Sequence, residues 1–210
     1  MRLTKEGWLR KTMTQKAKCV SQVKLHEGYL RLANYEFEIP SFHLPQKNLH
    51  ISNREIVHSS DSILVLIYAP ASDSFILCQE FRPGVFLNES QDDPFILECV
   101  SGTIEKNTNP RDTAIKEVYE ETGLKVEALK LIAIVYKSPG LMTEKCYLYY
   151  TEVKGIPAVG LHGVDSEEIK THCLKREKVY QLMDEIKIMD SASLIALNWF
   201  RANALGPKDS

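Results

Sequence analysis

Apolar and polar residues alternate through much of residues 18–40, a pattern typical of strands that bury one face. The alternation is interrupted once by a glycine, Gly28, so we expect an antiparallel hairpin or a small sheet in this part of the chain. Residues 40–53 contain two prolines and several turn-forming residues, which predicts a loop. The chain is therefore expected to begin with a small sheet that ends near residue 58.

A nearly continuous apolar run, SILVLIYA at residues 62–69, indicates a strand that is buried on both faces. Similar runs predict further strands at 75–81, 95–102, 129–140 (ending in a Pro-Gly loop), 145–153 and 169–175. Helical spacing of apolar residues predicts helices at about 110–122, 175–186 and 191–204, the last of them capped by Asp190. The fold class that follows is α+β, a mixed sheet with helices on its faces, preceded by the small N-terminal antiparallel sheet.

The composition of the 210 residues excludes several classes of protein. With 44% hydrophobic and 26% charged residues the chain is ordinary for a globular protein, and its net charge of −2 favours neither nucleic acid nor an anionic membrane as a partner. The five cysteines have no metal-like spacing, so we interpret them as reduced thiols. The N-terminus lacks the apolar core of a signal peptide, and no apolar run approaches about 18 residues. We therefore predict a cytoplasmic protein without a membrane segment.

The helix at 110–122 has clear end signals. Asn109 can cap its N-terminus, Pro110 suits the first turn, and Gly123 followed by an apolar residue is a usual stop. Its last turns contain the most unusual feature of the chain, a group of three carboxylates.

Glu117, Glu120 and Glu121 are spaced i, i+3 and i+4, so they project from one face of this helix. Like charges at this spacing cost about 0.2–0.5 kcal/mol per pair, and anions near a helix C-terminus cost about 0.3–1 kcal/mol each. A solvated acidic face is one interpretation. The other is a divalent cation, which would offset the repulsion between the three carboxylates.

The segment before the helix adds a second kind of ligand. Gly102 follows a predicted buried strand, so the backbone carbonyl of Ser101 or Gly102 can face the carboxylates. Carboxylates and a carbonyl form a ligand set suited to magnesium, which keeps its remaining positions for water and substrate phosphate. This combination points to phosphoryl chemistry, in which a metal ion neutralises a diphosphate and activates a water molecule.

These residues resemble the signature of the Nudix hydrolases, which is Gly, five residues, Glu, seven residues, then Arg-Glu-aliphatic-x-Glu-Glu-x-Gly-aliphatic. Seven of its nine fixed positions agree without a gap, namely Gly102, Glu117, Val118, Glu120, Glu121, Gly123 and Leu124. Thr108 replaces the first Glu and Lys116 replaces the Arg. Segments such as QEFRPG at 79–84, SPGLMTEK at 138–145 and LHGVDSEEIK at 161–170 extend the resemblance to bacterial ADP-ribose pyrophosphatases, over about residues 20–200.

The resemblance implies a Nudix fold and roles for particular residues. Metal ligands would be the Ser101 carbonyl, Glu117 and Glu121, with Glu120 completing or supporting the cluster. The general base falls on Asp165 or Glu167, between which the sequence does not decide. Contacts with the substrate would come from Arg54 and Arg82 at the diphosphate and nucleotide, Tyr29 by stacking on the base, and Glu144 at the terminal sugar.

The expected activity is Mg²⁺-dependent hydrolysis of a nucleoside diphosphate sugar, with ADP-ribose giving AMP and ribose 5-phosphate, and with Mn²⁺ as an alternative ion. GDP-mannose and UDP-glucose are rival substrates of the same class. A rival of another class is a catalytically weak Nudix domain that binds a nucleotide sugar as a regulatory signal, because Thr108 and Lys116 depart from the signature.

The resemblance also implies a homodimer. Residues 1–58 would form a β-rich dimerisation and substrate-binding region, and residues 59–210 the Nudix catalytic domain. Lys116 keeps the charge of the signature Arg but loses its planar two-point fork, so it would hold the carboxylates less rigidly.

Overall fold

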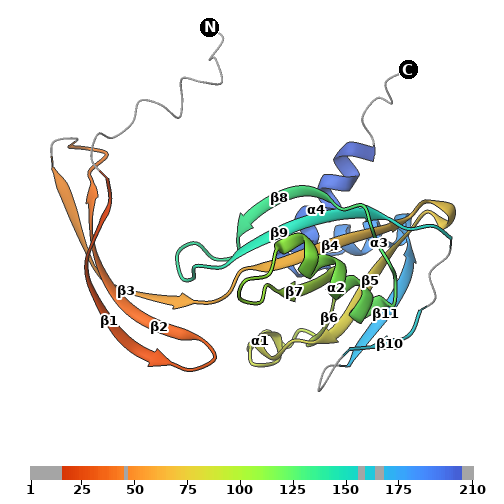
Figure 1. The fold of residues 1–210 in the computed structure, drawn as a ribbon, viewed down its shortest axis with the longest axis horizontal. Coiled ribbons are helices and arrows are strands. Elements are labelled where there is room, and N and C mark those ends of the chain that lie inside the picture. Colours follow the sequence, from red (N-terminus) through yellow and green to blue (C-terminus); the bar gives the residue numbers. More distant parts are fainter. Residues whose placement is uncertain (1–15, 45–46, 156–158, 164–167, 205–210) are drawn as a thin grey trace, which may run out of the picture. The chain divides into compact units, whose positions relative to one another are not determined.

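The computed structural model describes residues 16–44, 47–155, 159–163 and 168–204. The chain divides into two compact units, one of residues 1–59 with 138–143 and the other of residues 60–137 with 144–210 (Figure 1). The roles predicted for residues 1–58 and 59–210 stay predictions.

The first unit is a three-stranded antiparallel sheet in the order β1-β2-β3. Its strands are β1 (Lys18–Glu27), β2 (Arg31–Pro40) and β3 (Asn48–His58). The alternating pattern thus predicted the first two strands, whereas the loop expected at 40–53 is wrong in its second half.

The third strand begins inside the predicted loop because its turn-forming residues are accommodated by an irregularity in the ladder. The register of β2 against β3 shifts between Tyr35 and Phe37, and Asn53 in the facing strand has φ 54°. Asparagine tolerates this left-handed conformation better than most residues, so it marks a bulge here rather than the end of a strand.

The second unit is built on an eight-stranded mixed sheet in the order β10-β11-β5-β4-β9-β8, with β6 paired to β5 and β7 to β4. The pairing of β4 with β9 is parallel and the others are antiparallel. The strands are β4 (Ser62–Ala69), β5 (Ser74–Phe81), β6 (Phe95–Glu98), β7 (Val100–Thr103), β8 (Lys130–Tyr136), β9 (Lys145–Glu152), β10 (Leu161–His162) and β11 (Ile169–Lys175).

Helices cover both faces of this sheet. Figure 1 shows α2 (Pro110–Thr122) in front of the strands and α3 (Arg176–Asp184) and α4 (Ser191–Ala204) behind them. A single helical turn, α1 (Pro83–Phe86), and a 3-10 turn, η1 (Pro70–Ser72), complete the unit. The α+β class, with a mixed sheet between helices and a small antiparallel sheet before it, is therefore confirmed.

The central strand β4 explains how one apolar run supports two helical layers. Leu64 and Leu66 belong to the core beneath α3 and α4, whereas Ile63, Val65 and Ile67 belong to the core beneath α2. Successive side chains of a strand point to opposite faces, so a strand covered on both faces must be apolar throughout. All five side chains are at most 1% exposed.

Strands β4 and β5 pair over only three residues before each takes a new partner. Ile67 to Ala69 pair with Ser74 to Ile76, after which β7 pairs with the first half of β4 and β6 with the second half of β5. The chain passes directly from β6 to β7 through Cys99. The two central strands therefore part at one end of the sheet.

The predicted helix caps are observed. The side chain of Asn109 accepts a hydrogen bond from the Arg111 N–H at 2.8 Å, and Asp190 Oδ2 accepts one from the Ser193 N–H at 2.7 Å. Gly123 ends α2 with φ 69°, a conformation that favours glycine. These contacts fix both ends of the acidic helix and the start of α4.

Among the described residues, no helix combines the length and the apolar character needed to span a bilayer. All five cysteines are free thiols, as predicted, and Cys78, Cys99 and Cys146 are buried.

Candidate active site

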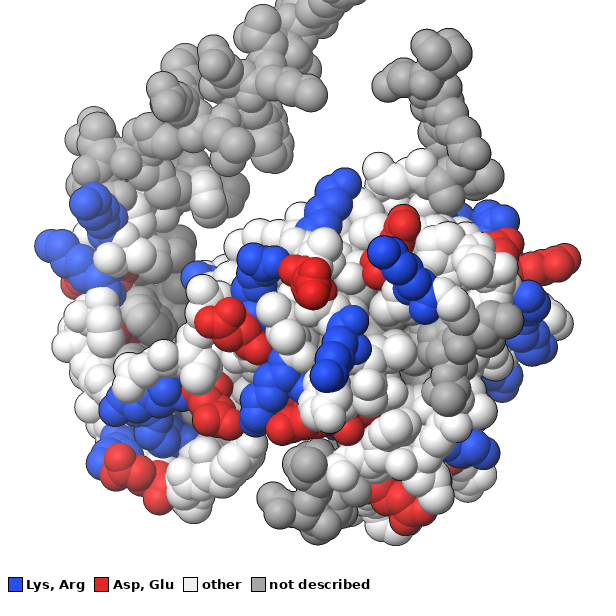
Figure 2. Space-filling view, turned by 45° about the vertical axis from the view of Figure 1, so that its right-hand side comes forward, with Lys and Arg blue, Asp and Glu red and all other residues white. Residues whose placement is uncertain are grey.

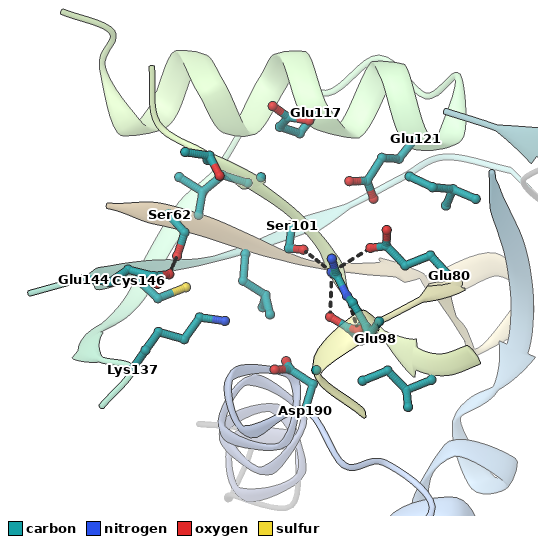
Figure 3. A pocket seen from close by; sticks show the side chains of 18 of the residues that line it. Ser62, Glu80, Glu98, Ser101, Glu117, Glu121, Lys137, Glu144, Cys146 and Asp190 are labelled. Carbon is teal, nitrogen blue, oxygen red and sulfur yellow. Dashed lines mark hydrogen bonds and ion pairs between the residues drawn. The ribbon is translucent and has the colours of Figure 1, made fainter. Parts of the chain in front are cut away.

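A cavity of about 680 Å³ opens in the second unit where β4 and β5 part. This volume is in the range of ligand-binding pockets. Its walls come from β4, β5, β6, β7, α2 and the start of α4, and Figure 3 shows many of its side chains. The lining contains eight carboxylates (Glu80, Glu98, Glu105, Glu117, Glu120, Glu121, Glu144 and Asp190) and three cationic side chains (Arg82, Lys116 and Lys137).

Glu117 lies directly against the backbone of β7. A Cβ atom placed on Gly102 would be 2.4 Å from the Glu117 Cδ atom and 2.7 Å from its Oε1 atom. Real Cβ atoms do not approach other atoms so closely, so only glycine at this position allows the carboxylate its observed place. The predicted neighbours Gly102 and Glu117 are thus in contact, and Ser101 lines the same cavity.

Glu121 is the most buried of the three helix carboxylates, with 6% of its surface exposed. Its pKa is raised to about 8, chiefly by burial and also by the charges of Glu80 and Glu117, while a hydrogen bond with Cys78 and the charge of Arg82 oppose the change. The interpretation of the helix as having a solvated acidic face is therefore wrong for Glu121. An ionised carboxylate at this position requires positive charge nearby.

Arg82 contacts two acidic residues and the side chain of Ser101 in β7 at one wall of the cavity. Its guanidinium donates to Glu98 at 2.7 and 2.9 Å and to Ser101 Oγ at 3.2 Å, and it lies 2.6 Å from Glu80 Oε1; dashed lines in Figure 3 end on these three residues. Burial alone would lower the pKa of Arg82, but the bonds to Glu98 and the charges of Glu98 and Glu80 outweigh it. The guanidinium of Arg82 is therefore already paired with two protein carboxylates, those of Glu98 and Glu80.

The two residues that depart from the signature, Thr108 and Lys116, both contact Glu105. Lys116 Nζ is 3.4 Å from Glu105 Oε1 and 3.5 Å from Glu120 Oε2. Thr108 donates its hydroxyl to the backbone oxygen of Glu105 at 2.6 Å, which holds the turn that presents Glu105. Glu105 thus supplies the carboxylate partner that the signature places at position 108.

This ion pair is solvated, and its strength is limited accordingly. Lys116 and Glu105 expose 53% and 71% of their side chains, and exposed pairs contribute about 0.2–1 kcal/mol. Glu120 is held by Lys116 at the rim, whereas Glu117 and Glu121 reach inside. The three acids predicted as one cluster therefore occupy two environments.

The residues that line the cavity fit a hard divalent cation. Oxygen ligands dominate the cavity, and Glu117 and Glu121 extend into it from α2 (Figure 3). Within the described ranges, no group of three or more His, Cys, Asp or Glu side chains is arranged to enclose an ion. A magnesium ion does not require such a cage, because it commonly uses one or two protein carboxylates and takes its other ligands from water and phosphate.

Opposite the helix, the cavity has a different character. Figure 3 shows Lys137 and Asp190 on the side of the cavity that faces Glu117 and Glu121, with Glu144 and Ser62 beside them. Ser62 donates its hydroxyl to Glu144 Oε1 at 2.6 Å, which fixes this carboxylate at the wall. The predicted sugar contact Glu144 therefore shares the cavity with the predicted metal ligands.

The remaining predicted residues lie elsewhere. Tyr29 is in the turn between β1 and β2 and is 95% exposed, and Arg54 is an exposed residue of β3. Both belong to the first unit. Asp165 and Glu167, the two candidates for the general base, lie outside the described residues.

Sequence reasoning missed five charged cavity residues, Glu80, Glu98, Glu105, Lys137 and Asp190. Two of them left a signal. Glu98 interrupts the apolar run FILECV, and an acid within a buried strand needs a polar partner, which here is Arg82. Asp190 was recognised only as a helix cap. Lys137 follows a strand without any distinguishing pattern.

On the face shown in Figure 2, Lys and Arg side chains are interspersed with Asp and Glu side chains. The excess of carboxylates in the cavity is therefore a feature of the site, since both signs lie side by side on the surface in view.

Comparison with known proteins identifies the class that this fold and cavity define. The family model for the NUDIX domain matches residues 59–204. The chain belongs to the Nudix family of hydrolases.

Particular relatives are similar along nearly the whole chain. An ADP-ribose pyrophosphatase of Haemophilus influenzae is 34% identical and covers 90% of this chain and 88% of its own length. An ADP-ribose pyrophosphatase of Escherichia coli K12 is 31% identical, with 87% and 86% covered. A GDP-mannose pyrophosphatase of an Enterobacter species is 27% identical, with 92% and 99% covered.

A solved structure described as an ADP compounds hydrolase superposes with a TM-score of 0.67, at 16% identity, covering 90% of this chain and 94% of the other. At this identity the likeness supports the fold alone.

Proposed function

We propose that this chain hydrolyses the diphosphate bond of a nucleoside diphosphate sugar in an Mg²⁺-dependent reaction, with ADP-ribose as substrate and AMP and ribose 5-phosphate as products. Water attacks one phosphorus, the bond from that phosphorus to the bridging oxygen breaks, and the proton lost by water passes to a base. The observation that carries the proposal is the cavity in which Glu117 and Glu121 face Glu144 across a space of ligand size.

The names of the relatives support ADP-ribose over other diphosphates. The relatives from Haemophilus influenzae and Escherichia coli K12, at 34% and 31% identity, are both ADP-ribose pyrophosphatases, and the likeness extends over most of each chain. The GDP-mannose pyrophosphatase at 27% identity favours GDP-mannose as the second candidate. UDP-glucose has no corresponding relative among these.

In this proposal, the role of each residue follows from its position in the cavity. Glu117 and Glu121, with the Ser101 carbonyl, would hold the metal ion, and Glu120 at the rim would support them. Arg82 keeps Glu98 and Glu80 in place through three close contacts, so its first effect is to shape the wall. When bound, Mg²⁺ or Mn²⁺ supplies positive charge to the diphosphate and lowers the pKa of a coordinated water.

The proposed general base remains Asp165 or Glu167. Arg54 and Tyr29, in the first unit, remain proposed contacts with the nucleotide. An arginine can bind phosphate bidentately or stack on a base, and a tyrosine exposed in a turn offers a free aromatic face.

We further propose that the protein is a cytoplasmic homodimer in which the strand-rich first unit contributes to dimerisation. The strands β1 and β3 of that unit expose several large apolar side chains, namely Val20, Val23, Leu25 and Leu49. Apolar side chains exposed on a small sheet are typical of a surface that a second subunit covers.

A catalytically weak regulator remains the rival of another class. The Glu105–Lys116 pair weakens the argument for it, since the signature carboxylate and cation are both represented in space.

The test of the reaction is phosphate release, coupled to excess alkaline phosphatase, from ADP-ribose, GDP-mannose, UDP-glucose, ADP-glucose and NADH, each with and without Mg²⁺. We expect release from ADP-ribose that requires Mg²⁺ and exceeds release from the others. Binding of Mg²⁺ without release from any of these compounds would instead support the regulator.

A further inference from the structure

Three cationic side chains line the cavity, and two of them are already paired with acids. Arg82 contacts Glu98 and Glu80, and Lys116 contacts Glu105 and Glu120. The side chain of Lys137 forms no hydrogen bond or ion pair with any residue that the structure describes. Among the residues that the structure describes, it is thus the one cavity cation without a carboxylate partner.

The position of Lys137 is fixed by its backbone. It follows the last residue of β8, and its N–H donates to the Glu144 backbone oxygen at 3.2 Å. Figure 3 shows its ammonium directed into the cavity, on the side opposite Glu117 and Glu121. A ligand held by those two acids through a metal ion would therefore meet Lys137 on its other side.

Ion pairing with the neighbouring acids does not explain why the Lys137 side chain points into the cavity. Asp190 accepts from the Ser193 N–H, and Glu144 accepts from Ser62 Oγ, so each carboxylate has another partner. A lysine that served only to balance these charges would be expected within ion-pair distance of one of them. An exposed ammonium that lines a cleft and has no partner among the described residues is instead suited to an anionic ligand.

We propose that Lys137 is a substrate-binding residue whose ammonium donates a hydrogen bond to a non-bridging phosphate oxygen of the diphosphate. This inference rests on the proposed function, because the substrate supplies the anion. A charge-assisted hydrogen bond from a flexible lysine stabilises bound substrate and transition state alike, so its loss raises KM more than it lowers kcat.

The experiment compares wild type with Lys137→Met, Lys137→Arg and, as a matched control, Lys125→Met. Lys125 is an exposed lysine outside the cavity. For ADP-ribose hydrolysis we expect KM of Lys137→Met to rise about tenfold or more, with kcat changed less than about threefold. Lys137→Arg should restore most of the affinity, and Lys125→Met should behave as wild type. An unchanged KM in Lys137→Met would overturn the inference while leaving the proposed function intact.

A second readout does not depend on turnover. Calorimetric titration with inorganic pyrophosphate in the presence of Mg²⁺ should show binding to wild type and about tenfold weaker binding to Lys137→Met. If wild type hydrolyses none of the substrates but this difference is found, the proposed function fails and the anion site stands. If pyrophosphate binds both proteins equally, or binds neither, the role of Lys137 is refuted. Unfolding curves of the four proteins should coincide, because the Lys137 side chain has no described protein partner to lose.

Discussion

Gly102 and Glu117 show at the scale of single residues why the cavity needs its particular sequence. The glycine leaves the space that the carboxylate occupies, and any Cβ atom there would overlap Glu117 Cδ at 2.4 Å. Glycine is therefore needed here for the close approach of a side chain to the backbone and not for its conformational freedom, since Gly102 does not have a positive φ.

A Gly102→Ala variant should therefore displace the Glu117 carboxylate. We expect turnover to fall at least about tenfold, whereas the free energy of unfolding should change little, because the atoms that an added Cβ would meet belong to a flexible side chain that can move aside. Steady-state kinetics and chemical denaturation measure the two effects. Gly140→Ala is the matched control, since an added Cβ there meets nothing within 4 Å. Equal activity of the two variants would show that Glu117 does not need its observed place.

The burial of Glu121 is expected to lower the stability of the metal-free protein, although the same carboxylate is proposed to bind the metal ion. A buried carboxylate beside Glu80 and Glu117 is unfavourable for folding unless a cation is bound.

We expect Glu121→Gln to reduce turnover by about 100-fold or more, because metal ligation is worth several kcal/mol in the transition state. Its thermal midpoint in EDTA should equal or exceed that of wild type, since the amide removes a buried acid. Steady-state kinetics with Mg²⁺ measures the loss of turnover, and thermal unfolding in EDTA measures the midpoint. A strongly lowered midpoint would mean that the carboxylate is primarily structural.

At the scale of elements, the break between β6 and β7 is sustained by a helix on the far side of the sheet. Cys99 lies between the two strands, and its N–H donates to the buried hydroxyl of Ser193 in α4 at 2.9 Å. This bond supports the chain between Glu98 and Ser101, both of which line the cavity.

Removing that hydroxyl in Ser193→Ala should leave a buried N–H without an acceptor. We expect the free energy of unfolding to fall by about 1–3 kcal/mol, measured by urea denaturation. Ser191→Ala, at an exposed position of the same helix, should change it by less than about 0.5 kcal/mol. Similar values for the two variants would mean that the Cys99 bond contributes nothing.

The elements that could be predicted from sequence are those with strong local signals. The apolar run SILVLIYA predicted both ends of β4 correctly, and Asn109 and Gly123 predicted both ends of α2. Short elements carried no such signal. The single turn of α1 and the two residues of β10 are set by tertiary packing, and the first half of β3 was hidden by its turn-forming residues.

At the scale of the whole molecule, the residues of the site divide in the same way. Glu117, Glu120 and Glu121 could be found because their spacing lies on one helix. Glu80 lies in β5, Glu98 in β6 and Lys137 directly after β8, and these segments meet only in the folded protein, so no local pattern joins the three residues. Burial likewise separates Glu121 from Glu120, which helical spacing alone treats as equivalent.

The proposed homodimer belongs to this scale as well. Sedimentation at micromolar concentration should give a particle of about twice the 23.9 kDa chain mass, because the first unit exposes apolar side chains that a second subunit would cover. Replacing Val23, which is 58% exposed, with Lys should shift the equilibrium toward monomer. A compact monomer for the unmodified protein would contradict the proposal.

The most direct test of the central claim is the chromatographic measurement of products formed from ADP-ribose by wild type and by Glu121→Gln, each with Mg²⁺ and with EDTA. Our account predicts AMP and ribose 5-phosphate in equal amounts from wild type with Mg²⁺, and almost none in the other three reactions. Equal product formation by Glu121→Gln, or products in EDTA, would contradict the claim that the carboxylates of α2 act by holding a metal ion.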